Sequence, residues 1–205
     1  MHQKNLITAG KALDKATKAL IMIHGRGASA EDILSMSSYL AVKDFALIAP
    51  QATNHTWYPY SFMLSPLQNE PWLSSALSLI KDIVADVSNK GIASENIYFM
   101  GFSQGACLTL EFVARNAARF GGVAAFSGGL IGDKIYTENY KGDFSSTPIF
   151  IGASDPDIHV RVERVHATAK ILKDLNAAVT EKVYKNMGHT INEDEINTAN
   201  AIVFK

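Results

Sequence analysis

Short apolar runs alternate with longer amphipathic stretches along this chain. The runs are typical of strands buried on both faces, and their alternation with amphipathic stretches predicts crossover units in a mostly parallel sheet. The expected strands are residues 19–24, 45–49, 96–102, 122–127, 148–153 and 180–184. The expected helices are residues 30–40, 73–90, 104–116, 160–176 and 192–203. The pattern therefore predicts the α/β fold class.

The hydrophobic pattern is strongest at residues 73–90 and weakest at residues 6–10. Residues 73–90 keep a helical rhythm of apolar positions over five turns, which predicts one buried face, through Leu73, Leu77, Ile80, Ile83, Val84 and Val87. Residues 6–10 carry a weaker pattern, and we expect them to form an antiparallel edge pair with the lysine-rich stretch that follows.

The chain contains no internal repeat, no low-complexity tract and no Ser/Gly-rich linker. Its 205 residues are enough for one buried core. We therefore expect a single domain, residues 1–205, with helices on both sides of the sheet and no large cap domain. The site of such a domain is expected to be open.

Composition narrows the class of partner. A formal net charge of −1, a pI near 6.6 and 19% charged residues argue against a basic surface for nucleic acid or anionic lipid. No apolar run approaches the roughly 20 residues of a membrane helix, so membrane insertion is not expected. The N-terminal residues lack the unbroken apolar core of a signal peptide, and Cys107 is the one cysteine. These features predict a cytoplasmic protein with a small-molecule partner.

The strongest chemical signal is a glycine-flanked serine between an apolar strand and an apolar helix, in the run Gly101, Phe102, Ser103, Gln104 and Gly105. A serine in this context occupies a tight strand-to-helix turn, where small neighbours relieve crowding. The turn presents its hydroxyl at the helix N-terminus, whose positive potential stabilises negative charge on an attacked carbonyl. Ser103 is thus the candidate nucleophile, and the main-chain N–H of Gln104 is one candidate oxyanion donor.

A serine nucleophile needs a base and a group that orients the base. His189 follows the last expected strand beside a glycine, where it can reach the carboxyl edge of the sheet. Either Asp155 or Asp157 can supply the carboxylate, because both follow the strand at 148–153. We favour Asp155 as the first carboxylate after that strand, with Pro156 fixing the turn; Asp157 better suits a turn or helix cap.

A second oxyanion donor is expected from the glycine-rich loop after the first central strand, where the main-chain N–H of Arg26 is placed between Gly25 and Gly27. The Arg26 guanidinium either remains solvated or meets an anionic substrate group. The histidines lack metal-ligand spacing, so neither a metal nor a cofactor is expected. Cys107, on an apolar helix face, is expected to be an inert core residue.

Residues 51–72 form an aromatic loop after the strand at 45–49. Loops at strand ends commonly build binding sites, so its apolar side chains either line a substrate pocket or pack onto the domain. The candidates for substrate binding are Trp57, Tyr58, Phe62, Met63 and Leu64.

Taken together, these motifs resemble the phospholipase/carboxylesterase family of α/β-hydrolases, which includes acyl-protein thioesterases. The likeness spans nearly the whole chain, through His24–Gly25 with Gly27, Trp57–Tyr58, 101–105, 152–156 and Gly188–His189. It implies Ser103, Asp155 and His189 as the catalytic triad, with the amides of Arg26 and Gln104 as oxyanion donors. It also implies cofactor-free hydrolysis of carboxylic esters or thioesters by an uncapped domain that forms homodimers.

The chain departs from the family pattern at residues 157–160, which replace apolar residues and a second proline, and at Arg26, which stands where acyl-protein thioesterases carry an apolar residue. We therefore expect a carboxylesterase for small esters, acting through an acyl-enzyme on Ser103, rather than a protein thioesterase with a long acyl groove. A lactonase or peptidase using the same triad is an alternative. A degenerate hydrolase that only binds a small molecule is another.

Overall fold

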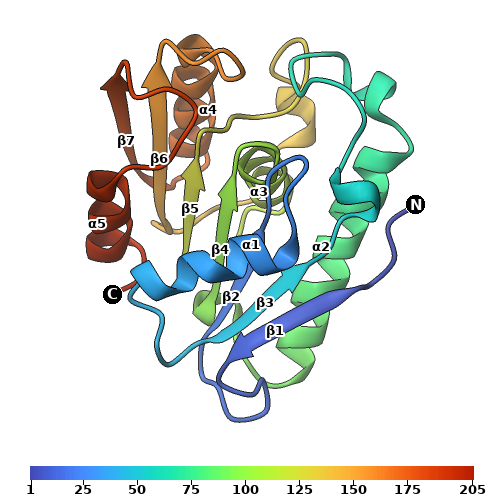
Figure 1. Cartoon of the computed structure of the whole chain (residues 1–205), viewed down its shortest axis with the longest axis vertical. Helices are drawn as coiled ribbons and strands as arrows, with labels where there is room; N and C mark the ends of the chain where they lie inside the picture. Colours follow the sequence, from blue (N-terminus) through green and yellow to red (C-terminus); the bar gives the residue numbers. More distant parts are fainter.

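A seven-stranded sheet forms the centre of the protein in the computed structural model, which describes residues 1–205 (Figure 1). The strand order is β1-β3-β2-β4-β5-β6-β7. All neighbouring strands are parallel except β1 and β3, which confirms the mostly parallel α/β fold. The strands are β1 Leu6–Gly10, β2 Ala19–Ile23, β3 Ala46–Pro50, β4 Ile97–Phe102, β5 Gly122–Phe126, β6 Pro148–Asp155 and β7 Ala178–Lys185.

The edge strand β1 has a different partner from the one expected. It pairs antiparallel with β3, from Leu6 opposite Pro50 to Gly10 opposite Ala46. The lysine-rich stretch after it forms turns, in which the Lys15 and Ala16 amides donate to the Ala12 carbonyl. That stretch cannot offer a strand edge, whereas β3 leaves one side free for β1.

Five α-helices cover the two faces of the sheet (Figure 1). The apolar side chains of α1 and α5 pack on one face, and those of α2, α3 and α4 pack on the other. Strands β2 and β4 are buried on both sides, which explains their unbroken apolar sequences. The helices are α1 Ala30–Ser35, α2 Trp72–Asn89, α3 Gln104–Arg115, α4 Val162–Asp174 and α5 Glu193–Ile202. None is long and apolar enough to cross a membrane.

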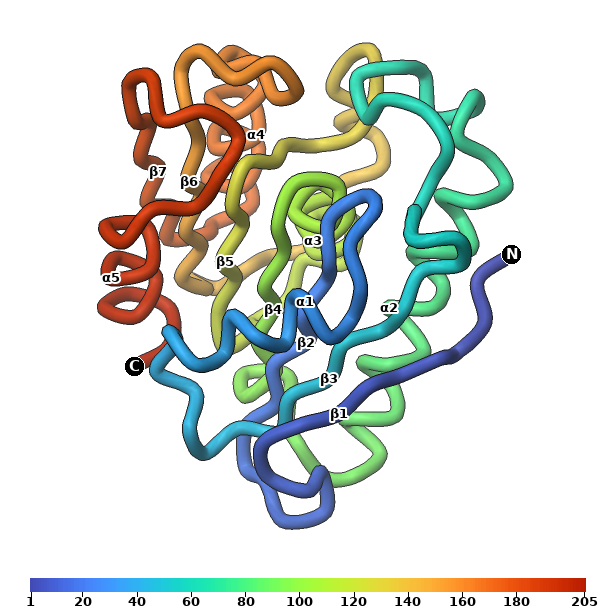
Figure 2. Tube along the Cα trace, in the orientation of Figure 1, coloured from blue at the N-terminus to red at the C-terminus, as the bar shows by residue number.

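The carboxyl ends of the parallel strands meet at the upper end of the sheet in Figure 2. The loops after β2, β3, β4, β6 and β7 therefore gather there, although they come from distant parts of the chain. Strand β6 continues to Asp155, two residues beyond the expected end at residue 153. This small difference determines which aspartate faces the site.

Candidate active site

Ser103 sits at the turn between β4 and α3 with positive backbone torsion, φ 55° and ψ −119°. The strands and α3 approach one another closely here, because Gly101 and Gly105 place no side chain between them. A Cβ on Gly101 would come 2.4 Å from the Gly105 carbonyl oxygen, and a Cβ on Gly105 would come 2.1 Å from the Ile23 carbonyl oxygen. The Ser103 amide also donates to the Phe126 carbonyl at 2.9 Å. The turn is therefore fixed by both neighbouring strands.

A hydrogen-bonded chain joins serine, histidine and aspartate. His189 Nε2 lies 2.7 Å from Ser103 Oγ, and His189 Nδ1 lies 2.8 Å from Asp157 Oδ2. Because an ionised carboxylate only accepts hydrogen bonds, it favours the tautomer with the proton on Nδ1. Nε2 is then free to accept the serine proton, as a general base requires.

The expectation that Asp155 pairs with His189 is wrong. Asp155 is the last residue of β6, where it pairs with Lys185 and is exposed. Because the strand is longer than expected, Asp157 is the first carboxylate after it. The first carboxylate after β6 does pair with His189, but β6 ends two residues later than the sequence predicts.

Asp157 also fulfils the capping role expected of it, using its second oxygen. Oδ1 accepts the amides of His159 at 2.7 Å and Val160 at 3.1 Å. Burial, with only 1% of the side chain exposed, acts to raise the pKa of Asp157. The bonds from His189 and the two amides outweigh it, so this pKa lies below its ordinary value. Asp157 thus remains an anion beside the histidine at neutral pH.

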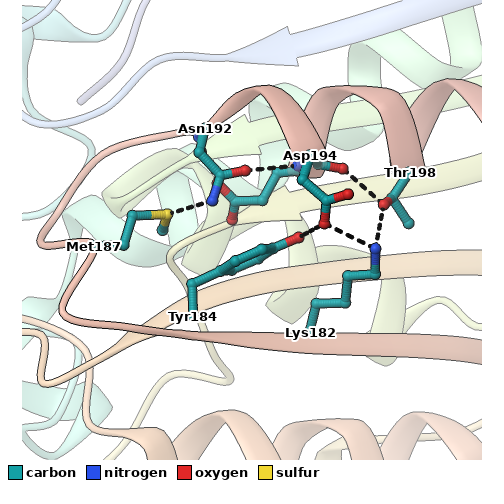
Figure 3. Close-up of polar contacts among 7 residues, drawn as sticks. Lys182, Tyr184, Met187, Asn192, Asp194 and Thr198 are labelled. Carbon is teal, nitrogen blue, oxygen red and sulfur yellow. Dashed lines mark hydrogen bonds and ion pairs between the residues drawn. The ribbon is translucent and has the colours of Figure 1, made fainter.

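The loop that carries His189 is held where it leaves β7 and where it enters α5 (Figure 3). The hydroxyl of Tyr184 in β7 donates to Asp194 in α5 at 2.6 Å. The Asn192 side-chain amide donates to the sulfur of Met187 at 2.9 Å, within the loop. These contacts set the separation of the two ends and limit the positions open to the imidazole.

The loop after β2 is organised by a buried histidine. His24 Nε2 accepts the Ala52 amide at 3.1 Å, so Nδ1 carries the proton and donates to the Gly25 carbonyl at 2.7 Å. Burial lowers the pKa of His24 and keeps it neutral. A peptide's C=O and N–H point in opposite directions, so fixing Gly25 also fixes the N–H of Arg26.

The two residues expected to supply the oxyanion amides lie at the same cleft. Arg26 and Gln104 line the same cleft as Ser103 and His189. The Arg26 N–H donates no hydrogen bond within the protein, and the Gln104 N–H, at the first position of α3, has no intrahelical acceptor. Both amides are therefore available to a developing oxyanion. The Arg26 guanidinium, by contrast, is bound to protein carbonyls and is not free for an anionic substrate.

The expected substrate-binding residues divide into three groups. Tyr58 and Phe62 line the cleft. Trp57 is fully buried behind it and donates from Nε1 to the His24 carbonyl at 2.9 Å. Met63 lines a neighbouring hollow, whereas Leu64 is exposed outside the cleft. The aromatic loop therefore both lines the site and packs onto the domain.

Sequence reasoning missed several cleft residues. His159 lies edge-on to His189, with ring centroids 4.7 Å apart, and Val160 and Phe102 line the same space. Cys107 contributes to the cleft lining but is 1% exposed, and burial raises the pKa of its thiol to about 12, consistent with an inert residue. A turn at Asp157 brings His159 into the cleft, and only a correct end for β6 could have indicated this.

A parallel sheet between helices, with a serine at a strand-to-helix turn and its histidine and aspartate on later loops, defines an α/β-hydrolase. A family model described as Phospholipase/Carboxylesterase matches residues 6–203. The chain belongs to this family, which confirms the resemblance found in the sequence. Family and site together make it an enzyme of the serine-hydrolase class.

Individual relatives agree with this assignment. The crystal structure of a phospholipase/carboxylesterase from Dyadobacter fermentans DSM 18053 superposes with a TM-score of 0.98 and 51% identity, covering 100% of this chain and 98% of that one. Acyl-protein thioesterase 1 of Saccharomyces cerevisiae is 23% identical, with 98% of each chain covered. An Arabidopsis thaliana protein named "Probable carboxylesterase SOBER1-like" is 32% identical over 60% of this chain, but the match spans only 48% of that protein.

Proposed function

We propose that this enzyme hydrolyses small carboxylic esters through an acyl-enzyme on Ser103. The observation that carries the proposal is the continuous chain of hydrogen bonds from Ser103 Oγ through His189 to Asp157. Family membership supports the coarser reading of ester or thioester hydrolysis. The near-neutral charge of the chain suits a small-molecule substrate rather than a polyanion.

In the proposed reaction, His189 Nε2 removes the Ser103 proton as Oγ attacks the acyl carbonyl carbon. The carbonyl oxygen becomes an anion and accepts hydrogen bonds from the amides of Arg26 and Gln104. His189 then gives its proton to the leaving alkoxide or thiolate, and the C–O or C–S bond breaks. Asp157 stabilises the imidazolium while it exists.

Deacylation reverses these roles. Water loses a proton to His189 and attacks the acyl-enzyme carbonyl, and the proton returns to Ser103 Oγ as the acid leaves. The reaction consumes one water and needs no cofactor. The same steps can cleave a lactone or an amide, because the triad does not select the leaving group.

The proposal is tested by following hydrolysis of p-nitrophenyl acetate and butyrate by the wild type and by Ser103→Ala. We expect ester turnover by the wild type and a loss of at least about 10³-fold in the variant, because the covalent route is removed. Parallel assays with a thioester, a lactone and an anilide of matched acyl length identify the preferred leaving group. Undiminished hydrolysis by the variant, or no turnover of any of these substrates, would reject the proposal.

A further inference from the structure

The loop opposite Ser103 is attached to Arg26 by an unusual set of contacts. We call residues 56–60 the wall segment, because Tyr58, Pro59 and Tyr60 line the cleft. The Arg26 guanidinium donates from Nη1 to Thr56 Oγ1 and the Pro59 carbonyl, both at 2.9 Å. It donates from Nη2 to the Tyr58 carbonyl at 3.0 Å and the Tyr60 carbonyl at 2.8 Å. One planar cation therefore gathers four acceptors from this segment.

Gln104, at the start of α3, holds the same segment through its side chain. Its side-chain Oε1 accepts the Trp57 amide at 2.9 Å and Thr56 Oγ1 at 3.3 Å. Its Nε2 donates to the Tyr58 carbonyl at 2.8 Å. Gln104 is 6% exposed, so solvent competes little for these bonds.

The two residues that hold the wall segment also supply the proposed oxyanion donors. Both residues line the cleft, and their side chains extend to the wall segment. A displacement of the wall therefore strains the backbone of Arg26 or Gln104 or breaks these bonds. The oxyanion site and the pocket wall behave as one rigid unit.

The wall segment also bounds the cleft. The cleft has a volume of about 600 Å³. Tyr58, Phe62 and Cys107 line it and are 1%, 7% and 1% exposed, so these side chains are packed into the domain. Because Tyr58, Pro59 and Tyr60 line the cleft, an acyl group too large for it pushes against the wall segment, and the Arg26 and Gln104 bonds oppose that movement.

We infer that Arg26 and Gln104 are positioning residues whose side chains hold the wall segment in place and thereby limit the size of the acyl group that the cleft accepts. The inference rests on the proposed esterase function and goes beyond it, by assigning acyl-length selection to two side chains outside the catalytic triad. A substitution of either side chain leaves the main-chain N–H of that residue in place. The role of the side chain in holding the wall segment can therefore be tested separately from the role of the N–H as oxyanion donor.

The first test compares Arg26→Met with Arg26→Lys and with Arg119→Met, an exposed arginine on another part of the surface as the matched control. Activity is measured on p-nitrophenyl esters with acyl chains of two to ten carbons. For Arg26→Met we expect kcat/KM on the acetate to fall roughly 10- to 100-fold, because small displacements of a positioned group cost about this much. The decanoate should lose far less, so the decanoate-to-acetate ratio rises about tenfold.

Arg26→Lys should recover part of the acetate activity, because an ammonium group still donates hydrogen bonds but cannot match the fork of four. The double variant Gln104→Met with Arg26→Met should lower kcat/KM on the acetate by less than the product of the two single effects. Both side chains act on the same wall segment, so their effects are not independent. If every chain length loses activity by the same factor in a folded Arg26→Met protein, or the variant behaves as Arg119→Met does, the inference is overturned.

A second measurement reports on the wall without using activity. In a Trp72→Phe background, buried Trp57 is the one remaining tryptophan and lies in the wall segment. We expect Arg26→Met to increase acrylamide quenching of Trp57 several-fold, whereas Arg119→Met leaves it unchanged. Equal quenching in the two variants would contradict a wall held by Arg26. An enzyme that hydrolyses no ester yet shows the quenching change would instead count against the proposed function alone.

Discussion

At the scale of single residues, Asp157 combines two tasks that a carboxylate can perform at once. One oxygen orients His189, and the other closes the turn through the amides of His159 and Val160. The turn fixes the carboxylate, and the carboxylate fixes the imidazole. Asp155, two residues earlier, is exposed at the end of β6 and touches neither His189 nor Ser103 in the hydrogen-bond network.

The neighbouring aspartates provide a matched pair of variants. Asp157→Asn should lower kcat for ester hydrolysis by about 10³- to 10⁴-fold, because the neutral amide favours the wrong histidine tautomer and cannot stabilise the imidazolium. Asp155→Asn should stay within about twofold of the wild type. The measurement is kcat of both variants on one short ester under steady-state conditions. A larger loss in Asp155→Asn than in Asp157→Asn would identify Asp155 as the triad acid.

Glu195 is a buried carboxylate that the reaction does not use. One oxygen, Oε2, accepts the Asn192 amide at 2.8 Å in the capping box of α5. The other, Oε1, is buried without a hydrogen-bond partner against Gly152. Burial raises the pKa of Glu195 to about 7. The folded protein therefore keeps this proton between pH 4.5 and about 7, where the unfolded chain releases it.

Because the folded state binds the extra proton, the contribution of Glu195 to stability falls as pH rises through that window. We expect the free energy of unfolding of the wild type, relative to Glu195→Gln, to decrease by about 1–3 kcal/mol between pH 5 and pH 8. Urea denaturation of both proteins at the two pH values measures this difference and cancels the titration of other groups. A constant difference would show that the pKa of Glu195 is not raised in the folded state.

At the scale of elements, the site depends on how closely α3 crosses β2 and β4. Gly105 lies over the carbonyls of Ile23 and His24 at distances that exclude any side chain. The helix N-terminus can thus approach the loop after β2, which brings Gln104 and Arg26 to the same cleft. A wider crossing would separate the two oxyanion donors.

Gly105→Ala should therefore cost about 3 kcal/mol or more in unfolding free energy, because backbone atoms on both sides must shift. Gly25→Ala is the control: a Cβ there meets its nearest atoms at 3.4 Å, an ordinary contact, and should cost less than about 1 kcal/mol. Thermal or urea denaturation compares the two. Similar stability of both variants would mean that the crossing can relax and does not fix the site.

At the scale of the whole molecule, the sequence predicted the features that depend on pattern. Buried parallel strands have unbroken apolar runs, so their order with the helices was readable, and Ser103 was recognisable from its glycines and flanking elements. The pairing partner of β1 could not be predicted from the sequence, because pairing at the edge of a sheet depends on which strand leaves a free side. The choice of Asp155 failed because the end of β6 depends on its pairing with β7 through Lys185, which local sequence does not encode.

The wall contacts were similarly beyond sequence reasoning. The sequence marks Arg26 only as an isolated loop arginine, because three of its four acceptors are backbone carbonyls more than thirty residues away, with no residue type to mark them. Gln104 was expected to act through its backbone, and its side-chain role emerges only when the aromatic loop folds over α3. Long-range contacts to main-chain groups leave little trace in one sequence.

The central claim is that Ser103 is the nucleophile of an ester hydrolase, and covalent labelling tests it most directly. The purified protein is treated with a fluorophosphonate, residual p-nitrophenyl butyrate hydrolysis is followed over time, and the modified peptide is identified by mass spectrometry. We expect one adduct per chain, on Ser103, with activity lost in proportion to labelling and with Ser103→Ala unlabelled. Labelling at another residue, or full labelling of Ser103 with ester hydrolysis undiminished, would contradict the account.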